Sequence, residues 1–158
     1  MGHQITALLV AEPFDEAAAR EWDVEGLPLG HDLRLIHISL AYASYQQRLR
    51  RVGTLLDVPD DFPPIFPREA VLADLAASVT GRSPAPFAVI MTEYFGGVGD
   101  QWACVFHDGA RVAAVEDING ALRALGVRPD AGFDEFDTVG LGAHRRTPDA
   151  LDRYDLLD

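Results

Sequence analysis

The sequence predicts an α+β fold, in which helices pack on one face of a mostly antiparallel sheet. Three β-prone runs, residues 86–95, 101–107 and 111–115, are spaced closely enough to form a three-stranded meander. Helical segments precede and follow this meander instead of alternating regularly with strands. Of the 158 residues, 48% are hydrophobic and 24% are charged, which is typical of one globular domain. We therefore expect residues 1–158 to form a single domain.

The N-terminal segment predicts two strands separated by a short helix. Residues 4–11 are an apolar run of strand length that ends before a proline. Residues 13–21 carry that proline and acidic residues in a first turn, followed by alanines, which favours a short helix. Residues 31–38 alternate in character and predict a second strand, with Leu35 and Ile36 on opposite faces.

The central segment predicts two helices and an ordered loop. Residues 39–51 place apolar side chains at helical spacing, and residues 68–80 do so more clearly, with Gly81 as a stop signal. Between them, residues 57–67 contain four prolines and three acids, which excludes regular pairing. Because this proline-rich loop also carries aromatic residues such as Phe66, we expect it to pack on the body of the domain.

The C-terminal segment predicts a hairpin turn, a capped helix and a tail. The Asp-Gly pair at residues 108–109 is a strong signal for a tight hairpin turn. Asp117 can cap a helix that stops at Gly126. From residue 130 the chain is acidic, and we expect an irregular segment with a last helical turn at residues 148–156.

Charge narrows the classes of partner. The chain has a formal net charge of −12, and its acidic residues are spread along the sequence. A broadly negative field disfavours nucleic-acid backbones and anionic lipid surfaces, and it speeds encounter with basic proteins. All thirteen basic residues are arginine, a bias typical of a GC-rich genome, and we expect a bacterial source. The sequence thus favours a basic protein partner, with no nucleic acid and no membrane.

The cysteine content and the N-terminus favour the cytoplasm. Cys104 is the only cysteine, so neither an intrachain disulfide nor a cysteine-based zinc site can form. The first residues lack the basic and long apolar regions of a secretory signal, and no apolar run reaches the ~18 residues of a membrane span. We expect a cytoplasmic protein, either a monomer or a homodimer.

No motif for catalysis or metal binding is present. The five histidines include no i, i+4 pair and no His-Glu-x-x-His. Cys104 alternates with Trp102 and Phe106, which predicts a buried side chain and not a reactive thiolate. No serine lies in a Gly-x-Ser-x-Gly motif. We therefore expect no metal and no cofactor, and we lean towards a protein that is not an enzyme.

The sharpest local feature is the segment EYFGGVGDQW at residues 93–102. Its glycines favour a hairpin connection, and they also allow a loop that binds a ligand or a partner. The segment lacks the Lys-Ser/Thr of a phosphate-binding loop, and its acids disfavour phosphate. The candidate binding residues in it are Glu93, Tyr94, Gly96, Gly97, Asp100, Gln101 and Trp102.

The first functional hypothesis is a non-catalytic, acidic binding protein that occludes a basic protein, as immunity or inhibitor-type proteins do. Its surface would combine Glu93, Asp100 and Trp102 with the acidic residues Asp134, Glu135 and Asp137. Electrostatic complementarity would then supply fast and specific association.

The alternative hypothesis is a small enzyme or ligand-binding domain. Its site would lie near the glycine-rich loop at residues 96–99 and would use His37, His107, Tyr94 and Asp100. A general base beside polar anchors requires these four side chains to converge in one concave site. Convergence in space therefore discriminates between the two hypotheses.

Overall fold

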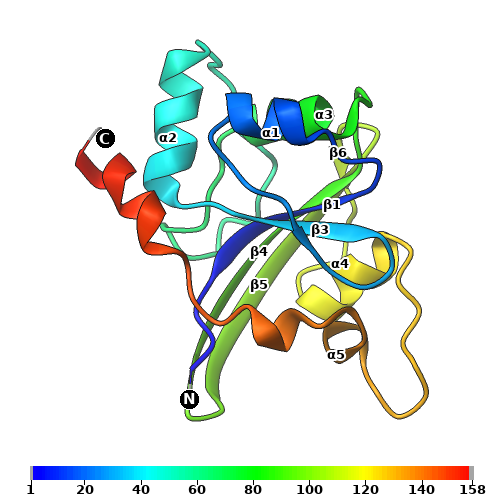
Figure 1. Cartoon of the computed structure of the whole chain (residues 1–158). Helices are drawn as coiled ribbons and strands as arrows, with labels where there is room; N and C mark the ends of the chain where they lie inside the picture. The colour runs from blue at the N-terminus through cyan, green and yellow to red at the C-terminus, as the bar shows by residue number, and fades with distance from the viewer. Residues whose placement is uncertain (1, 157–158) are drawn as a thin grey trace.

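A computed structural model of the chain describes residues 2–156. Its six strands form one antiparallel sheet in the order β2-β3-β1-β4-β5-β6 (Figure 1). The strands are β1 (Thr6–Ala11), β2 (Leu27–Pro28), β3 (Leu33–His37), β4 (Phe87–Phe95), β5 (Val98–His107) and β6 (Ala110–Arg111). The α+β class is confirmed, and β4, β5 and β6 form the predicted meander with a short last strand.

The structure contains five α-helices and two 3₁₀ helices within residues 2–156, and of their N-terminal capping residues only Asp117 was predicted from the sequence. The helices are α1 (Glu16–Glu21), α2 (Leu40–Leu49), α3 (Val71–Thr80), α4 (Ile118–Ala124) and α5 (Glu135–Val139), with 3₁₀ helices η1 (Leu141–Ala143) and η2 (Asp149–Leu156). Ser39 caps α2 and Asp117 caps α4 by accepting backbone N–H bonds. Gly81 ends α3 in the left-handed conformation, as expected of a helix stop.

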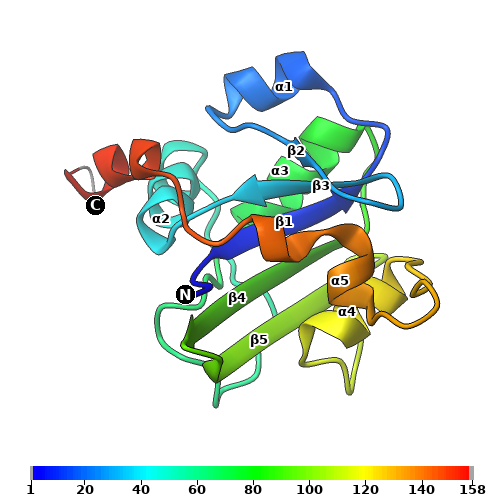
Figure 2. The same cartoon turned by 60° about the horizontal axis from the view of Figure 1, so that its bottom comes forward.

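Helices cover both faces of the sheet, so the expectation that they pack on one face is wrong. In β1, Leu8 and Val10 join a core layer with α1, α2 and α3, whereas Ala7 and Leu9 join a second layer with α4 and α5. Because consecutive residues of a strand point to opposite faces, a strand that is apolar throughout needs a cover on each side. Figures 1 and 2 show α1 and α3 on one side of the sheet and α4 on the other.

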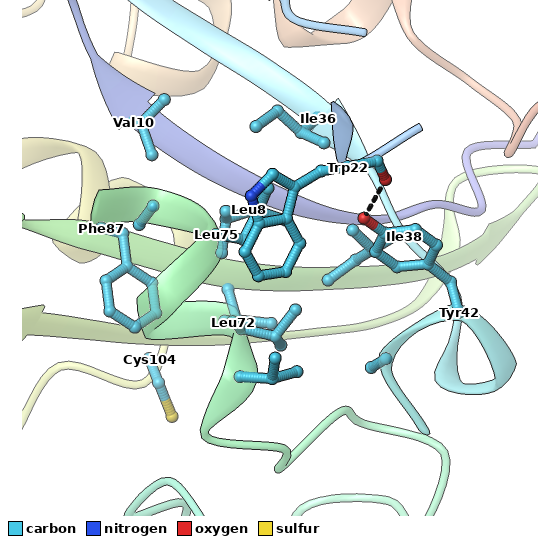
Figure 3. Packing of buried hydrophobic residues seen from close by; sticks show 14 of the residues in the cluster. Leu8, Val10, Trp22, Ile36, Ile38, Tyr42, Leu72, Leu75, Phe87 and Cys104 are labelled. Carbon is cyan, nitrogen blue, oxygen red and sulfur yellow. Dashed lines mark hydrogen bonds between the residues drawn. The ribbon is translucent and has the colours of Figure 1, made fainter. Parts of the chain in front are cut away.

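The first core layer also anchors the proline-rich loop. Trp22 and Tyr42 belong to this layer, and the Tyr42 hydroxyl donates to the Trp22 carbonyl at 2.6 Å (Figure 3). Phe62 and Phe66 of the loop are buried against the layer, with ring centroids 5.0 Å apart. The Arg68 guanidinium donates to the carbonyls of both phenylalanines at 3.2 and 3.1 Å. The loop therefore packs on the body, as predicted.

The segment from residue 130 is more regular than predicted. It contains α5 and η1, which join the second core layer through Val139 and Leu141. The predicted last helical turn is η2, whose Tyr154 ring meets Tyr42 edge-on with centroids 5.0 Å apart. Within residues 2–156, no helix has the length and apolar character needed to cross a bilayer.

Candidate functional site

The glycine-rich segment forms the turn of the β4–β5 hairpin. Phe95 pairs with Val98, which leaves Gly96 and Gly97 as a two-residue turn with φ angles of 62° and 81°. Two consecutive positive φ angles favour glycine and match the twist of the flanking strands. At Gly99, a Cβ atom would lie 1.8 Å from the Glu93 carbonyl oxygen, so only glycine fits. The hairpin interpretation of this segment is confirmed.

Beyond the core, the hairpin presents one row of paired side chains. Glu93 pairs with Asp100 across the two strands, and Phe95 pairs with Val98, on the face of the first core layer. Phe95 is 60% exposed and Val98 is 77% exposed, while Trp102 is half-buried where the row meets the core. We call Glu93, Phe95, Val98, Asp100 and Trp102 the hairpin surface.

Two like charges face each other at the centre of the hairpin surface. Glu93 and Asp100 are directly opposite and both are exposed. Among residues 2–156, neither carboxylate has an ion-pair or hydrogen-bond partner. Opposed like charges destabilise an antiparallel pair, so these two side chains contribute nothing favourable to the free fold.

A cleft borders the hairpin surface on its inner side. It has a volume of about 300 Å³ and lies between the start of β1, the end of β4 and the proline-rich loop. Glu93 and Met91 line it from the hairpin, Arg146 from the C-terminal segment, and Ile65 from the loop. Ile65 is 56% exposed, so an exposed apolar side chain lines the same cleft as Glu93.

Tyr94 and Gln101, also predicted to bind, lie on the other face of the hairpin. The Gln101 side-chain amide donates to the Tyr94 hydroxyl at 3.1 Å. Its oxygen accepts the Ile118 backbone N–H at 2.7 Å. Gln101 therefore fixes the start of α4, and the structure separates these two residues from Glu93, Asp100 and Trp102.

The predicted acidic residues near position 135 lie at the start of α5. Asp134 caps the helix by accepting the Asp137 backbone N–H at 2.9 Å. Glu135 pairs with Arg123 at 2.9 Å, and this hydrogen bond lowers the pKa of the Glu135 carboxyl. Because α5 packs on the second core layer, this group and the hairpin surface lie on opposite faces of the sheet.

The four residues of the enzyme hypothesis do not converge. The strand register places His37 level with Ala103 of β5, three strands away. His107 lies four residues further along β5, so the two histidines are roughly 19 Å apart at ordinary strand spacings. Tyr94 and Asp100 lie beyond Ala103 in the opposite direction. These side chains therefore do not share one concave site.

A different cleft surrounds His37. It has a volume of about 320 Å³, and Asp23, Leu27, His37 and Arg153 are among the residues that line it. His37 Nδ1 is buried and has no hydrogen-bond partner among the described residues. Burial lowers the pKa of His37 to about 4, and the nearby His144 contributes to this shift. No local sequence pattern indicates this cleft, because α1, β3 and η2 form it from distant parts of the chain.

Asp23, which lines the His37 cleft, is held by two residues of η2. It accepts hydrogen bonds from the Tyr154 hydroxyl and from the Arg153 guanidinium. The hydrogen bond from Tyr154 is the largest cause of a lowered pKa for the Asp23 carboxyl, and the bond from Arg153 lowers this pKa further. The carboxylate is therefore ionised and engaged in holding the C-terminal segment in place.

Within residues 2–156, the structure contains neither an accessible thiol nor a cluster of side chains that could hold a metal ion. Cys104 is buried in the first core layer, and burial raises the pKa of its thiol to about 12. This confirms its prediction as a small core side chain. Across the part of the chain that the structure describes, no group of three or more His, Cys, Asp or Glu side chains is arranged to hold a metal ion.

Phe95 and Val98 were not among the binding residues predicted from the sequence. A two-residue Gly-Gly turn at positions 96 and 97 would have placed both residues in the row of Glu93, because a hairpin turn fixes the strand register. Comparison with known proteins adds no further assignment: no protein-family model, no curated protein and no solved structure matches this chain.

Proposed function

We propose that this chain is a non-catalytic binding protein that occludes a basic protein partner through the hairpin surface, in the manner of an immunity or inhibitor-type protein. The observation that carries the proposal is the exposed pair of Glu93 and Asp100. The pair is unfavourable in the free protein, and a cationic partner would convert its repulsion into attraction.

The composition of the hairpin surface supports this proposal. Trp102 and Phe95 are large aromatic side chains of the kind that form hot spots, and Val98 adds apolar area opposite Phe95, beside the turn. Apolar contacts of this kind supply affinity when they are desolvated, while the two carboxylates select a positively charged partner. The net charge of −12 would accelerate encounter with such a partner.

A cytoplasmic location is part of the proposal. The single thiol, Cys104, is buried and unpaired, which suits a compartment where disulfides do not form. An inhibitor that protects its own cell must meet its target there, so the location and the proposed role are consistent with each other.

The test is capture with matched charge variants. The tagged wild-type protein is compared with Glu93→Gln/Asp100→Asn, and with a control, Asp152→Asn/Asp155→Asn, that removes two exposed charges from η2. Each protein is incubated with source lysate at low salt and at ~0.5 M salt, and the retained proteins are identified by mass spectrometry.

We expect the wild type and the control to retain one basic protein stoichiometrically at low salt. The Glu93→Gln/Asp100→Asn variant should not retain this protein, and at high salt the wild type and the control should lose it too. Calorimetry with that purified protein then gives its affinity for each variant. Equal retention by all three proteins, or a partner that is not basic, would refute the role of the hairpin surface. Absence of any retained protein would refute the binding function.

A second candidate function is the binding of a small ligand in the His37 cleft, favoured by the buried and unpartnered Nδ1 of His37. A histidine with a pKa of about 4 is a weak base at neutral pH, so hydrogen bonding to a ligand is favoured over general-base catalysis. A screen by NMR with ¹⁵N-labelled imidazoles would test this function. A ligand of this cleft shifts the His37 signals, whereas unchanged signals across a library of polar metabolites count against it.

A further inference from the structure

The outer edge of β5 is open beside the hairpin surface. The Thr92 backbone N–H donates to Ile5 of the N-terminal segment, on the β1 side of β4. Because backbone groups alternate in direction along a strand, Glu93 bonds towards β5 and forms a hydrogen-bonded pair with Asp100. The N–H and C=O groups of Gly99 and Gln101 consequently point away from β4, towards the edge.

The rest of the β5 edge is closed by the chain itself. β6 pairs with Phe106 and His107, the Val112 N–H donates to the Val105 carbonyl at 2.9 Å, and the Ala103 N–H donates to the Glu116 carbonyl at 3.0 Å. For the outward backbone groups of Gly99 and Gln101, the described residues offer no partner. Figure 2 shows β5 as the outermost long strand, with α4 beside one end and the turn projecting at the other.

The side chains along this open edge determine which charge is favourable in a segment that pairs with β5. Open edges are usually protected by charged side chains, lysine above all, by proline or by a bulge, and of these features residues 98–102 carry only the acidic Asp100. The charge at this edge is the carboxylate of Asp100, with Glu93 behind it. A second copy of the chain would bring the same carboxylates and its own net charge of −12, which disfavours self-pairing and favours a cationic segment.

We infer that the basic partner docks by adding an extended segment to β5 as a seventh strand, antiparallel to residues 98–102. This inference rests on the proposed function and specifies how it is carried out. The partner residues opposite Gly99 and Gln101 exchange backbone hydrogen bonds with them. The residue opposite Asp100 then lies on the hairpin surface, in the close geometry of a pair without backbone hydrogen bonds.

The register specifies the sequence that this edge recognises. A basic residue faces Asp100 and reaches Glu93, and the residues two positions before and after it face Val98 and Trp102. Both of these flanking residues are apolar. The recognised pattern is therefore apolar-x-basic-x-apolar, in which the x residues face the side of Gln101 and are free to be polar.

The probe for this inference is the blocked peptide Thr-Val-Thr-Arg-Thr-Val-Thr. Titration into ¹⁵N-labelled protein should shift the amide signals of residues 98–102 and slow hydrogen exchange at Gly99 and Gln101. Two methylated versions separate backbone pairing from charge. N-methylation of the two threonines that flank the arginine blocks the bonds to β5, whereas N-methylation of the two valines modifies amides that point away from it.

The expected outcome is that threonine methylation weakens binding at least about tenfold, and that valine methylation leaves it within about twofold. Glu93→Gln/Asp100→Asn should weaken binding about fivefold. Three results would overturn the inference. The first is no shift of the amide signals at millimolar peptide, and the second is an equal loss of affinity from both methylated peptides. The third is protection of the Gly99 and Gln101 amides from hydrogen exchange that rises with protein concentration in the absence of peptide. The last result would identify a second copy as the occupant. The capture experiment separately decides whether the proposed function stands.

Discussion

Removing the charge of Asp100 should stabilise the free protein, although most substitutions destabilise. Its Cα atom lies about 5.5 Å from that of Glu93 in a hydrogen-bonded antiparallel pair, and both side chains are exposed. Two unit charges about 6 Å apart in water repel by about 0.7 kcal/mol, and salt at 0.15 M reduces this to about 0.3 kcal/mol. Asp100→Asn should therefore raise the free energy of unfolding by about 0.3 kcal/mol at physiological salt and by about 0.7 kcal/mol at low salt.

The assay is a double-mutant cycle of Glu93→Gln, Asp100→Asn and the combined variant, measured by urea unfolding at two salt concentrations. Each single variant should gain stability, and the double variant should gain no more than either, because the first substitution already removes the repulsion. Asp152→Asn corrects for the relief of the general negative field. Loss of stability in both single variants would show that the carboxylates support the fold, and it would refute the reasoning that links them to a partner.

Four other measurements test the hairpin, the His37 cleft and the core around Cys104. Gly99→Ala should lower the free energy of unfolding by about 2 kcal/mol or more, because its Cβ would meet a carbonyl oxygen, whereas Gly53→Ala, with open space around its Cβ, should be nearly neutral. Gln101→Leu should destabilise by about 1–2 kcal/mol in the same urea assay, because the first amide of α4 loses its acceptor. His37 has a pKa of about 4 when folded and the ordinary 6.5 when unfolded, so its contribution to stability is fully present above pH 6.5, is lost as the pH drops to 4, and does not change further below pH 4. Because solvent screens the half-buried ring, we expect the free energy of unfolding to fall by about 1–2 kcal/mol from this cause. His37→Asn should not show this fall in urea unfolding over the same pH range. Cys104 should resist thiol reagents at pH 8 in the native protein and react on unfolding, since its pKa is about 12.

Local signals in the sequence predicted most of the sheet correctly. In β3, Leu35 and Ile36 alternate between the two core layers as their spacing indicated. The Asp-Gly turn at residues 108–109 has positive φ at both positions and joins β5 to β6, as such a pair predicts. These features depend on backbone conformation and strand period, which neighbouring residues determine.

The features that were missed depend on contacts between distant segments. α5 has five residues, too few for a periodic signal, and it is held by its Asp134 cap and by contact between Phe136 and His3, whose ring centroids lie 5.4 Å apart. The second helical layer was not predicted, because the apolar run of β1 indicates a buried strand but does not identify the elements that cover each of its faces. The His37 cleft joins α1 to η2, from opposite ends of the chain, and no local pattern encodes that meeting.

The length of the β4–β5 hairpin is a further argument for a partner. β1 pairs with β4 only as far as Met91, and β4 then continues to Phe95 with β5 and the bridging His3 beside it. Ordering each backbone residue costs about 1–2 kcal/mol, and burial of apolar side chains is what normally offsets it. In the free chain Phe95 and Val98 provide little of that burial, since both are largely exposed. A partner strand along β5 would lie beside Val98 and satisfy the open backbone edge, so we expect it to stabilise the extended hairpin.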